Sequence, residues 1–250
     1  MKFDLYKDEI GTVEYVQHMG EDITIVNSAR VSFGKHKEEI DAKDKKLIKY
    51  LINHKHTSTL EHNIATFRFV VPLFIRSQHH RHRTWSYNEI SRRYTEENLR
   101  FYEPKTFRTQ HKSNRQASNL DEQDPIMGYF EDGGPNYASA VIRSHHRNSV
   151  SLYNDLMDKG VCREQARGVL PQNLYTEYYG TANLNNLLKF CGLRLHEGAQ
   201  WEIQKVAEGI IGICKNLWPI TINAYINCLE DKELAERLES IQVVEAEKHN

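Results

Sequence analysis

The chain has 250 residues, of which 39% are hydrophobic and 27% are charged, and its formal net charge at pH 7 is −1. This length allows one large domain or two small ones, and the low hydrophobic share predicts a surface that is largely polar or shared with another subunit. A near-neutral balance argues against bulk polyanion binding, because nucleic-acid-binding domains usually carry a clear basic excess.

Cysteine usage and apolar patterning indicate the compartment. The four cysteines are far apart and form no Cys-x-x-Cys pair, which predicts reduced thiols and neither a disulfide framework nor a zinc site. The first eleven residues lack an apolar signal segment, and the longest apolar stretch, 64–75, is interrupted by Arg68 and is too short to span a bilayer. We therefore expect a cytoplasmic protein without a membrane partner.

The first half of the chain alternates between strand and helix patterns. Residues 12–33 are predicted to form one or two short strands and a turn, and residues 42–54 an amphipathic helix with lysines opposite its apolar face. After a polar turn, residues 65–71 alternate as a half-buried strand does. Pro72 then suits the first position of a helix that ends at Arg81–Arg83, because proline lacks only an amide hydrogen that would be unpaired there.

The second half is predicted to be mainly helical. Residues 101–135 are polar and poor in aliphatic side chains, which predicts a long mobile loop and a candidate lid. The remaining expected elements are a helix at 137–159 closed by Gly160, a short helix at 163–171, a strand at 174–182, a helical region capped by Asn183 and continuing to about Leu217, and a charged C-terminal tail at 230–250 with an amphipathic helix. Because no repeat and no linker is evident, we predict one α+β domain over residues 1–250, a mostly antiparallel sheet packed with helices.

The segment RHRTWSYNEISRRY, Arg81–Tyr94, is the most informative part of the chain. It combines four arginines and one carboxylate, Glu89, with hydroxyl, amide and aromatic side chains. Guanidinium groups bind phosphate through paired hydrogen bonds, and flat rings stack on a heterocycle, so the mixture predicts a pocket for a phosphorylated, ring-bearing ligand. The alternative is a basic helix end that faces solvent. We interpret Glu89 mainly as a structural ion-pair partner of these arginines, and a contact with a ligand hydroxyl is its alternative role.

Two further arginines, Arg167 and Arg194, stand in helices of otherwise apolar or small residues. A buried unpaired charge is costly, so each is expected to have an anionic partner. The histidines near positions 54–62 and 79–82 fit no standard ligand spacing, so we expect no metal site. Glycine-rich phosphate loops are also missing from the sequence, which leaves side chains to hold any phosphate.

The arginine-rich segment resembles the signature of the flavin-dependent thymidylate synthases, which is Arg-His-Arg, seven residues and then Ser. Here these are Arg81, His82, Arg83 and Ser91. Other segments resemble family blocks in the same order, namely His56–His62, Ala166–Thr176 and Leu187–Gln204, and the similarity covers most of residues 24–225.

The resemblance implies the reductive methylation of deoxyuridine monophosphate (dUMP) at carbon 5 of uracil. Methylenetetrahydrofolate would supply the carbon, and FAD reduced by NADPH would supply the hydride, so the cofactor carries the electron chemistry and the protein positions it. It also implies a homotetramer with active sites at subunit interfaces. No cysteine nucleophile is needed in this family, and Ser91 would contact the nucleotide without attacking it.

The family pattern also implies roles for individual residues. Arg194 would be catalytic, since its fixed positive charge favours an ionised uracil ring and a more nucleophilic carbon 5. The pattern places dUMP against Gln78, His79, His80, Arg81, Glu89, Ile90, Ser91, Arg92, Arg93, Arg167 and Arg194. It places FAD against Ser58, Arg81, His82, Arg83, Glu89, Asn183, Asn185 and Lys189.

Several positions depart from the family pattern. Lys189 stands where many members have asparagine, Asn185 replaces a frequent arginine and Gly198 a frequent histidine, and His79 and His80 replace residues that are often aromatic. Lys189 is a candidate to take over the phosphate contact of the missing arginine.

Two other function classes stay open, a nucleotide- or RNA-binding module that uses Arg81–Arg93 and a metal-dependent hydrolase that uses the histidines.

Overall fold

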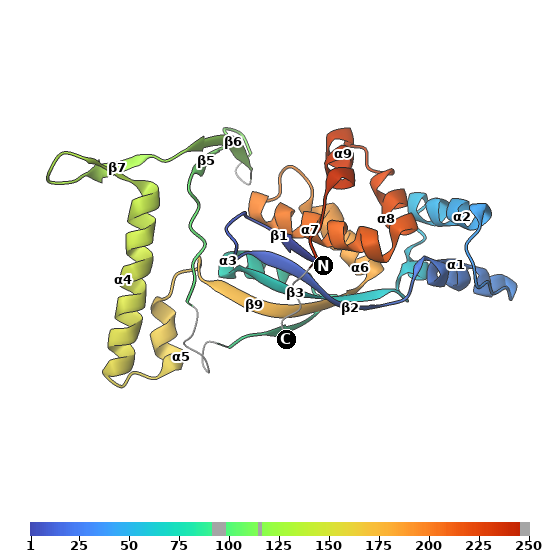
Figure 1. Cartoon of the computed structure of the whole chain (residues 1–250), viewed down its shortest axis with the longest axis horizontal. Coiled ribbons are helices and arrows are strands. Elements are labelled where there is room, and N and C mark those ends of the chain that lie inside the picture. The colour runs from blue at the N-terminus through green and yellow to red at the C-terminus, as the bar shows by residue number, and fades with distance from the viewer. Residues whose placement is uncertain (92–98, 115–116, 246–250) are drawn as a thin grey trace. The chain divides into compact units, whose positions relative to one another are not determined.

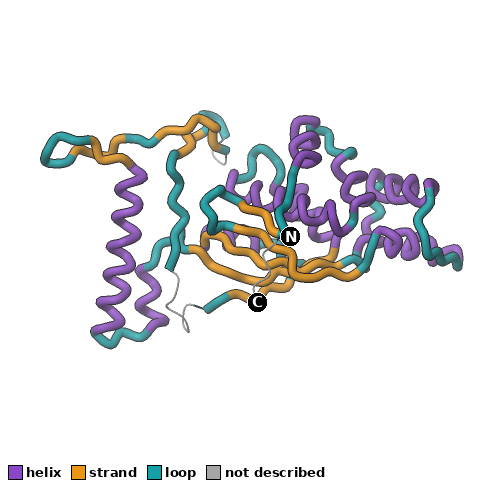
Figure 2. The backbone as a smooth tube through the Cα atoms, in the orientation of Figure 1, coloured by secondary structure: helices purple, strands orange, loops and turns teal. Residues whose placement is uncertain are grey.

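Figures 1 and 2 show a computed structural model of the chain, which describes residues 1–91, 99–114 and 117–245. The chain divides into two compact units, which are described separately below. Unit 1 comprises Met1–Val70, His79–Asn88 and Tyr178–Asn250, and unit 2 comprises Val71–Gln78 and Glu89–Glu177. The chain passes between the units within regular strands and helices, so no linker marks the boundary in the sequence.

A sheet forms the framework of unit 1, and its strand order in the described part of the chain is β1-β2-β3-β9-β4. Strand β2 pairs antiparallel with both β1 and β3, with an irregularity between Tyr15 and Gln17. Alternate residues of β3 from Ala65 to Phe69 are buried, which confirms the strand predicted there. The strands are β1 Lys2–Asp4, β2 Thr12–Met19, β3 Ile64–Pro72, β4 Ser86–Glu89 and β9 Tyr175–Asn183.

Helices cover one face of this sheet, and Figure 1 shows α7 lying across it. Ile203, Val206 and Ile210 of α7 are completely buried. A Cβ atom at Gly209 would lie 2.8 Å from Phe3 Cδ1, so β1 packs directly against the backbone of α7. The helices of unit 1 are α1 Asp22–Arg30, α2 Ala42–Asn53, α6 Leu184–Arg194, α7 Trp201–Leu217, α8 Pro219–Ile226 and α9 Lys232–Ser240, with short 3-10 turns at Val31–Phe33 and Thr57–Leu60.

Capping side chains explain where several of these helices begin. The Asn183 side chain accepts from the Asn186 amide at 3.0 Å, which confirms the predicted cap of α6. The helical region predicted to continue to about Leu217 is interrupted, since α6 stops at Arg194 and α7 starts at Trp201. In the turn between them the His196 ring accepts the Gly198 amide at 3.0 Å. The predicted helices at 42–54 and in the C-terminal tail are confirmed by α2 and α9.

Helix α1 corrects the prediction for residues 12–33. Only β2 is a strand, and residues 22–30 form a helix where the sequence predicted a strand and a turn. A reciprocal capping box between Glu21 and Thr24 starts this helix. The helix has few apolar residues, so its sequence shows only a weak helical period of hydrophobicity. Contacts with the rest of unit 1 bury Ile25 and Val26 completely.

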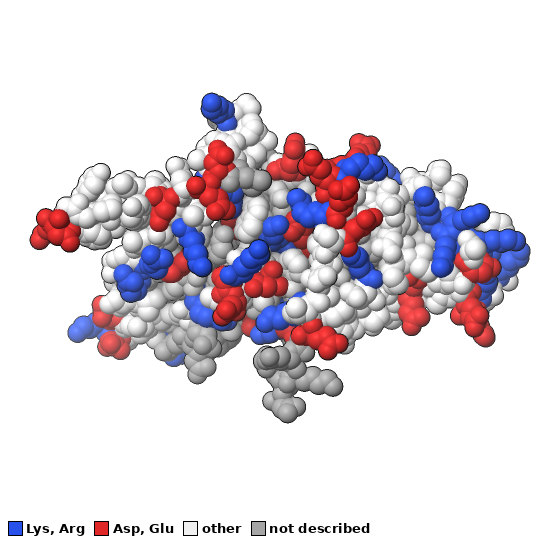
Figure 3. Space-filling model, turned by 45° about the horizontal axis from the view of Figure 1, so that its top comes forward, with Lys and Arg blue, Asp and Glu red and all other residues white. Residues whose placement is uncertain are grey.

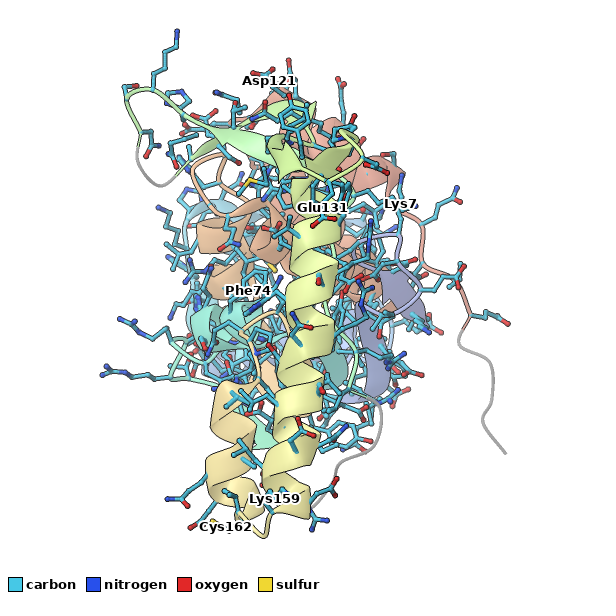
Figure 4. The ribbon with its side chains drawn as sticks, turned by 90° about the vertical axis from the view of Figure 1, so that its left-hand side faces the viewer. Lys7, Phe74, Asp121, Glu131, Lys159 and Cys162 are labelled. Carbon is cyan, nitrogen blue, oxygen red and sulfur yellow. The ribbon has the colours of Figure 1, made fainter. Side chains whose placement is uncertain are left out.

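Unit 2 is built on the long helix α4, Ala138–Asp158, which Figure 4 shows with Lys159 and Cys162 at one end. Gly160 follows it with a φ of +84°, a conformation that favours glycine, as predicted. The short predicted helix is present as α5 Arg163–Ala166 and a 3-10 turn at Arg167–Val169. Helix α3, Leu73–His79, starts after Pro72 but ends before the arginines it was expected to carry.

Residues 101–135 contain strands where the sequence predicted a long loop. Two antiparallel hairpins form there, one from β5 and β6 and one from β7 and β8. Both hairpins are narrow and largely solvent-facing, so their strands lack the alternation of apolar side chains that marks a half-buried strand. The strands are β5 Phe107–Gln110, β6 Ser118–Gln123, β7 Ile126–Tyr129 and β8 Pro135–Tyr137.

The surface carries both signs of charge, as the near-neutral net charge of the chain predicts. Acidic and basic side chains are interleaved over much of the face drawn in Figure 3, and basic ones gather over α1 and α2. No helix in the described ranges is long and apolar enough to cross a membrane.

Asp22 gives a direct test of the packing in unit 1. Its buried carboxylate accepts the backbone amides of Ile220 and Thr221, at 2.9 and 3.0 Å, and the Thr221 hydroxyl. Asp22→Ala leaves these donors unpaired, so we expect the free energy of unfolding to fall by roughly 2–4 kcal/mol. Urea unfolding at fixed protein concentration measures this loss. Asp231→Ala removes the cap of the more exposed α9 and should cost about 1 kcal/mol or less; equal losses would contradict the assignment.

Candidate functional site

His79 lies at the centre of an aromatic cluster in unit 1. Its Nδ1 atom is 2.8 Å from the Tyr178 hydroxyl, and its ring centroid lies 4.5 Å from that of Trp85 and 4.6 Å from that of Phe190. The residue has no exposed area, and burial lowers the pKa of its ring well below the ordinary value. A direct contact with a nucleotide was expected for His79, and it stays a prediction, because the structure shows a ring that is already enclosed by its own chain.

Next to this cluster, Arg194 at the end of α6 donates its Nε hydrogen to the Nε2 atom of His82, over 3.1 Å. The His82 ring also meets Phe190 edge to face, with 4.8 Å between the ring centroids. Burial, and secondarily the Arg194 charge, lowers the pKa of His82 to about 4. His82 is therefore neutral at pH 7, and its Nε2 atom accepts a hydrogen bond.

The charges of Arg194 and Arg81 are not neutralised within the described structure. Burial, and secondarily the Arg81 charge, lowers the pKa of Arg194, which shows that the two guanidinium groups act on one another. Neither side chain forms a salt bridge with a described carboxylate. Two arginines in this setting create a positive potential that suits an anionic ligand.

Tyr87 on β4 holds the segment between α3 and β4 through hydrogen bonds to its backbone. Its hydroxyl hydrogen is shared between the carbonyl oxygens of His79 and His82, at 3.0 and 3.2 Å. The His80 ring stacks on Tyr87 with 4.0 Å between centroids. Burial raises the pKa of Tyr87 well above its ordinary value, so the phenol keeps its proton and remains a donor.

The residues expected near the flavin divide into exposed and internal groups. Ser58, Arg83 and Lys189 are exposed, and neither cation forms a salt bridge in the described part of the chain. Asn183 uses its side-chain oxygen to cap α6. Asn185 is only 4% exposed and donates to Glu61 at 3.0 Å, so its side chain supports the core, and its flavin contact stays a prediction.

Unit 2 holds a second group of the expected residues. Glu89 accepts from the Thr176 hydroxyl at 2.7 Å and lies 3.2 Å from Arg76 Nε. It was expected to pair with the arginines of its own segment, and among the described residues its ion-pair partner is Arg76 from α3. The other expected residues in unit 2 are Gln78, Ile90, Ser91 and the exposed Arg167, while Arg92 and Arg93 lie outside the described residues.

Comparison with known proteins adds to this geometry. Residues 14–220 match the family model described as thymidylate synthase complementing protein. A flavin-dependent thymidylate synthase of Thermus thermophilus is 42% identical over 218 residues, which cover 86% of this chain and 75% of the relative. The chain belongs to this family. The corresponding enzyme of Thermosipho africanus is 38% identical over 216 residues, or 86% of this chain and 91% of that protein.

A solved relative agrees with the fold. The crystal structure of a UMP/dUMP methylase, PolB from Streptomyces cacaoi, bound with 5-Br dUMP, matches with a TM-score of 0.73 and 33% identity over 87% of this chain and 95% of that one. The family resemblance is thus confirmed, and the chain is a methyltransferase of the flavin-dependent thymidylate synthase family. The family match spans segments of both compact units.

Some residues of the site in this family member were missed from the sequence. Arg76 is an isolated arginine in the apolar stretch LFIRSQ, which is the signal that singled out Arg167 and Arg194. Tyr87 was noted only as a stacking ring, because its hydroxyl bonds are formed by a turn in the loop. Within the described ranges, no group of three His, Cys, Asp or Glu residues is placed to hold a metal ion.

The lowered pKa of His82 predicts a pH dependence of stability. The unfolded chain binds a proton at His82 below about pH 6.5, whereas the folded chain binds it only near pH 4. The free energy of unfolding should therefore fall as the pH is lowered from 6.5 towards 4, and the lowered pKa of His79 acts in the same direction. Urea midpoints at pH 7 and pH 5 measure the decline. His82→Gln should show a smaller decline than the wild-type protein, and an identical decline would contradict the neutral state of His82.

Proposed function

We propose that this enzyme converts dUMP to dTMP by reductive methylation at carbon 5 of the uracil ring. Methylenetetrahydrofolate is the proposed carbon donor, and FAD reduced by NADPH is the proposed source of the hydride. The observation that carries the proposal is the Arg81–Arg194 pair, two guanidinium groups beside an aromatic cluster that form no salt bridge with a described carboxylate. A pyrimidine nucleotide supplies both the negative charge and the flat ring that such a surface binds. The PolB relative, a UMP/dUMP methylase bound with 5-Br dUMP, supports the same substrate class.

Arg194 is the proposed catalytic residue. A guanidinium group stays protonated in proteins, so Arg194 keeps its charge even though burial lowers its pKa. Placed against the pyrimidine, this charge would favour the ionised ring and raise the electron density at carbon 5, the atom that receives the transferred carbon in the proposed reaction. Its half-buried position strengthens the effect, because less water screens the charge.

The exposed residues of unit 1 fit the phosphates of FAD. Arg81, Arg83 and Lys189 provide three cations without salt bridges in the described structure, and Ser58 adds a hydroxyl. The pyrophosphate of a dinucleotide needs such donors when no glycine-rich loop is present. His82, Asn183 and Glu89 complete the proposed flavin set. When bound, the reduced flavin supplies the hydride, while these side chains hold and orient it.

The remaining proposed nucleotide contacts are one residue of unit 1, His80, and a set from unit 2. They are Gln78, His80, Glu89, Ile90, Ser91, Arg92, Arg93 and Arg167. We propose that they act at subunit interfaces of a homotetramer. Large exposed apolar side chains, such as Phe33, Tyr129 and Leu193, support a shared surface. A cytoplasmic location, and small-molecule partners in place of nucleic acid or membrane, are parts of the same proposal.

The cysteines support a route without a thiol nucleophile. Cys191 and Cys214 are completely enclosed, and burial raises the pKa of both thiols, so neither forms the reactive thiolate. Cys162 and Cys228 are exposed, and Cys228 contacts Asn53 and the Ala224 carbonyl. None of the four belongs to the proposed ligand set.

Flavin binding is the first test of this function. We expect the purified protein to show the absorption bands of bound FAD. With methylenetetrahydrofolate present, we expect it to oxidise NADPH faster when dUMP is added, because transfer of the flavin hydride in the proposed reaction needs both dUMP and the carbon donor. Absorbance spectra and initial rates with and without dUMP measure this. UMP serves as a competing nucleotide, since the related PolB is a UMP/dUMP methylase. A colourless protein that takes up no added FAD would sink the proposal.

Arg194→Ala tests the catalytic assignment. Loss of a charge-assisted interaction should remove on the order of 1.5–3 kcal/mol, so dTMP formation should fall at least tenfold while FAD remains bound. Product is measured by chromatography, and flavin content by absorbance. Arg147→Ala is the matched control, because Arg147 is an exposed arginine on α4 outside the proposed site. Unchanged turnover in Arg194→Ala would show that the assignment is wrong.

A further inference from the structure

A short chain of contacts in unit 1 leads from Tyr87 to Arg194. The Tyr87 hydroxyl binds the carbonyl oxygen of His82, and the ring of the same histidine accepts the Nε hydrogen of Arg194. Phe190, one turn before Arg194 on α6, packs its ring edge to face against His82. The backbone and the ring of His82 are thus both held, so the acceptor atom has a defined position.

The contact requires one form of the His82 ring. An arginine Nε can only donate, so the Nε2 atom of His82 must carry no hydrogen, and the ring is neutral with its proton on Nδ1. The charged groups around His82 favour this form. Arg194 approaches from α6, Arg81 is its neighbour in the chain, His79 and His80 lie on the same segment, and Tyr87 stays protonated on β4.

Anchoring Arg194 through Nε has a geometric consequence. The guanidinium group is planar, and a fixed Nε–H leaves its two terminal nitrogens as a fork in a set plane. Neither terminal nitrogen has a hydrogen-bond or salt-bridge partner in the described residues. Such a fork binds two neighbouring acceptor atoms, and an ionised pyrimidine edge presents an oxygen beside a ring nitrogen.

We infer that His82 is a positioning residue for Arg194: the neutral imidazole of His82 sets the plane of the Arg194 guanidinium group. Tyr87 supports this role by holding the backbone of His82. This inference rests on the proposed function and deepens it, because it identifies what orients the catalytic charge. His82 then serves the nucleotide side of the site in addition to its proposed contact with FAD. Tyr87 acquires a role through its hydroxyl that touches neither ligand.

Three variants of the FAD-loaded enzyme separate orientation from packing. His82→Phe keeps a ring against Phe190 but removes the acceptor, so dUMP affinity should fall about tenfold. His82→Gln restores an acceptor near the same place and should bind dUMP within about threefold of the wild-type enzyme. Tyr87→Phe removes only the hydroxyl and should give an intermediate loss. Calorimetric titration with dUMP, without folate or NADPH, measures each affinity, and flavin absorbance and urea midpoints report cofactor content and folding.

A second readout follows the protonation of His82. Because burial and Arg194 hold the pKa of His82 near 4, the ring should stay neutral from pH 6 to pH 8. The ratio of dUMP affinities between wild type and His82→Gln should therefore be constant across this range, since ionisation of the phosphate affects both equally. Nitrogen chemical shifts in histidine-labelled protein without dUMP should show the proton on Nδ1. A change in the ratio near pH 6.5, or a proton on Nε2, would overturn the inference.

The outcomes distinguish this inference from the proposed function. If Arg194→Ala binds dUMP as tightly as wild type, the nucleotide role of Arg194 fails. If Arg194→Ala weakens binding while His82→Phe and Tyr87→Phe do not, the proposed function stands and the positioning role is wrong. If His82→Phe does not fold, the nitrogen shifts and Tyr87→Phe still decide the question.

Discussion

The site depends on the half-buried guanidinium group of Arg194, which has no carboxylate partner among the residues that the structure describes. Desolvation penalises the Arg194 charge, and the nearby Arg81 repels it. The protein stabilises Arg194 with a neutral acceptor, His82, and no carboxylate of residues 1–91, 99–114 or 117–245 compensates the charge. A carboxylate in the same place would bind the arginine more strongly, but it would also cancel the positive potential that an anionic ligand needs.

Strands and helices of unit 1 together fix the positions of His79, His82 and Arg194. Strands β3 and β9 bury Phe69 and Tyr178, which enclose His79 at the end of α3. Helix α6 starts at a capped asparagine and ends at Arg194, so its length sets where the guanidinium group emerges. Helix α7 then covers the sheet with a nearly continuous apolar surface. Because α6 has a capped start and its inner face is densely packed, Arg194 keeps its position without an ion pair to any described carboxylate.

In unit 2, the expected site residue Glu89 forms an ion pair, unlike Arg194 in unit 1. Glu89 is paired with Arg76 and bonded to Thr176, so its carboxylate is already oriented before any ligand binds. The two hairpins formed by β5 to β8 are short and exposed. Isolated two-stranded hairpins are marginally stable in water, which makes this region the part of unit 2 with the weakest internal support.

Local patterns in the sequence determined much of this protein. The alternation in β3, the amphipathic period of α2, the cap at Asn183 and the turn at Gly160 are each set by neighbouring residues, and the arginine-rich motif identified the family. Tertiary structure alone decided which polar groups meet. Glu89 turns to Arg76, His79 is enclosed by rings, Asn185 faces Glu61, and His82 reaches Arg194, which lies 112 residues away in the chain. The physical reason is that burial and charge pairing depend on distances between residues that are far apart in the chain. A local pattern of hydrophobic residues does not encode those distances.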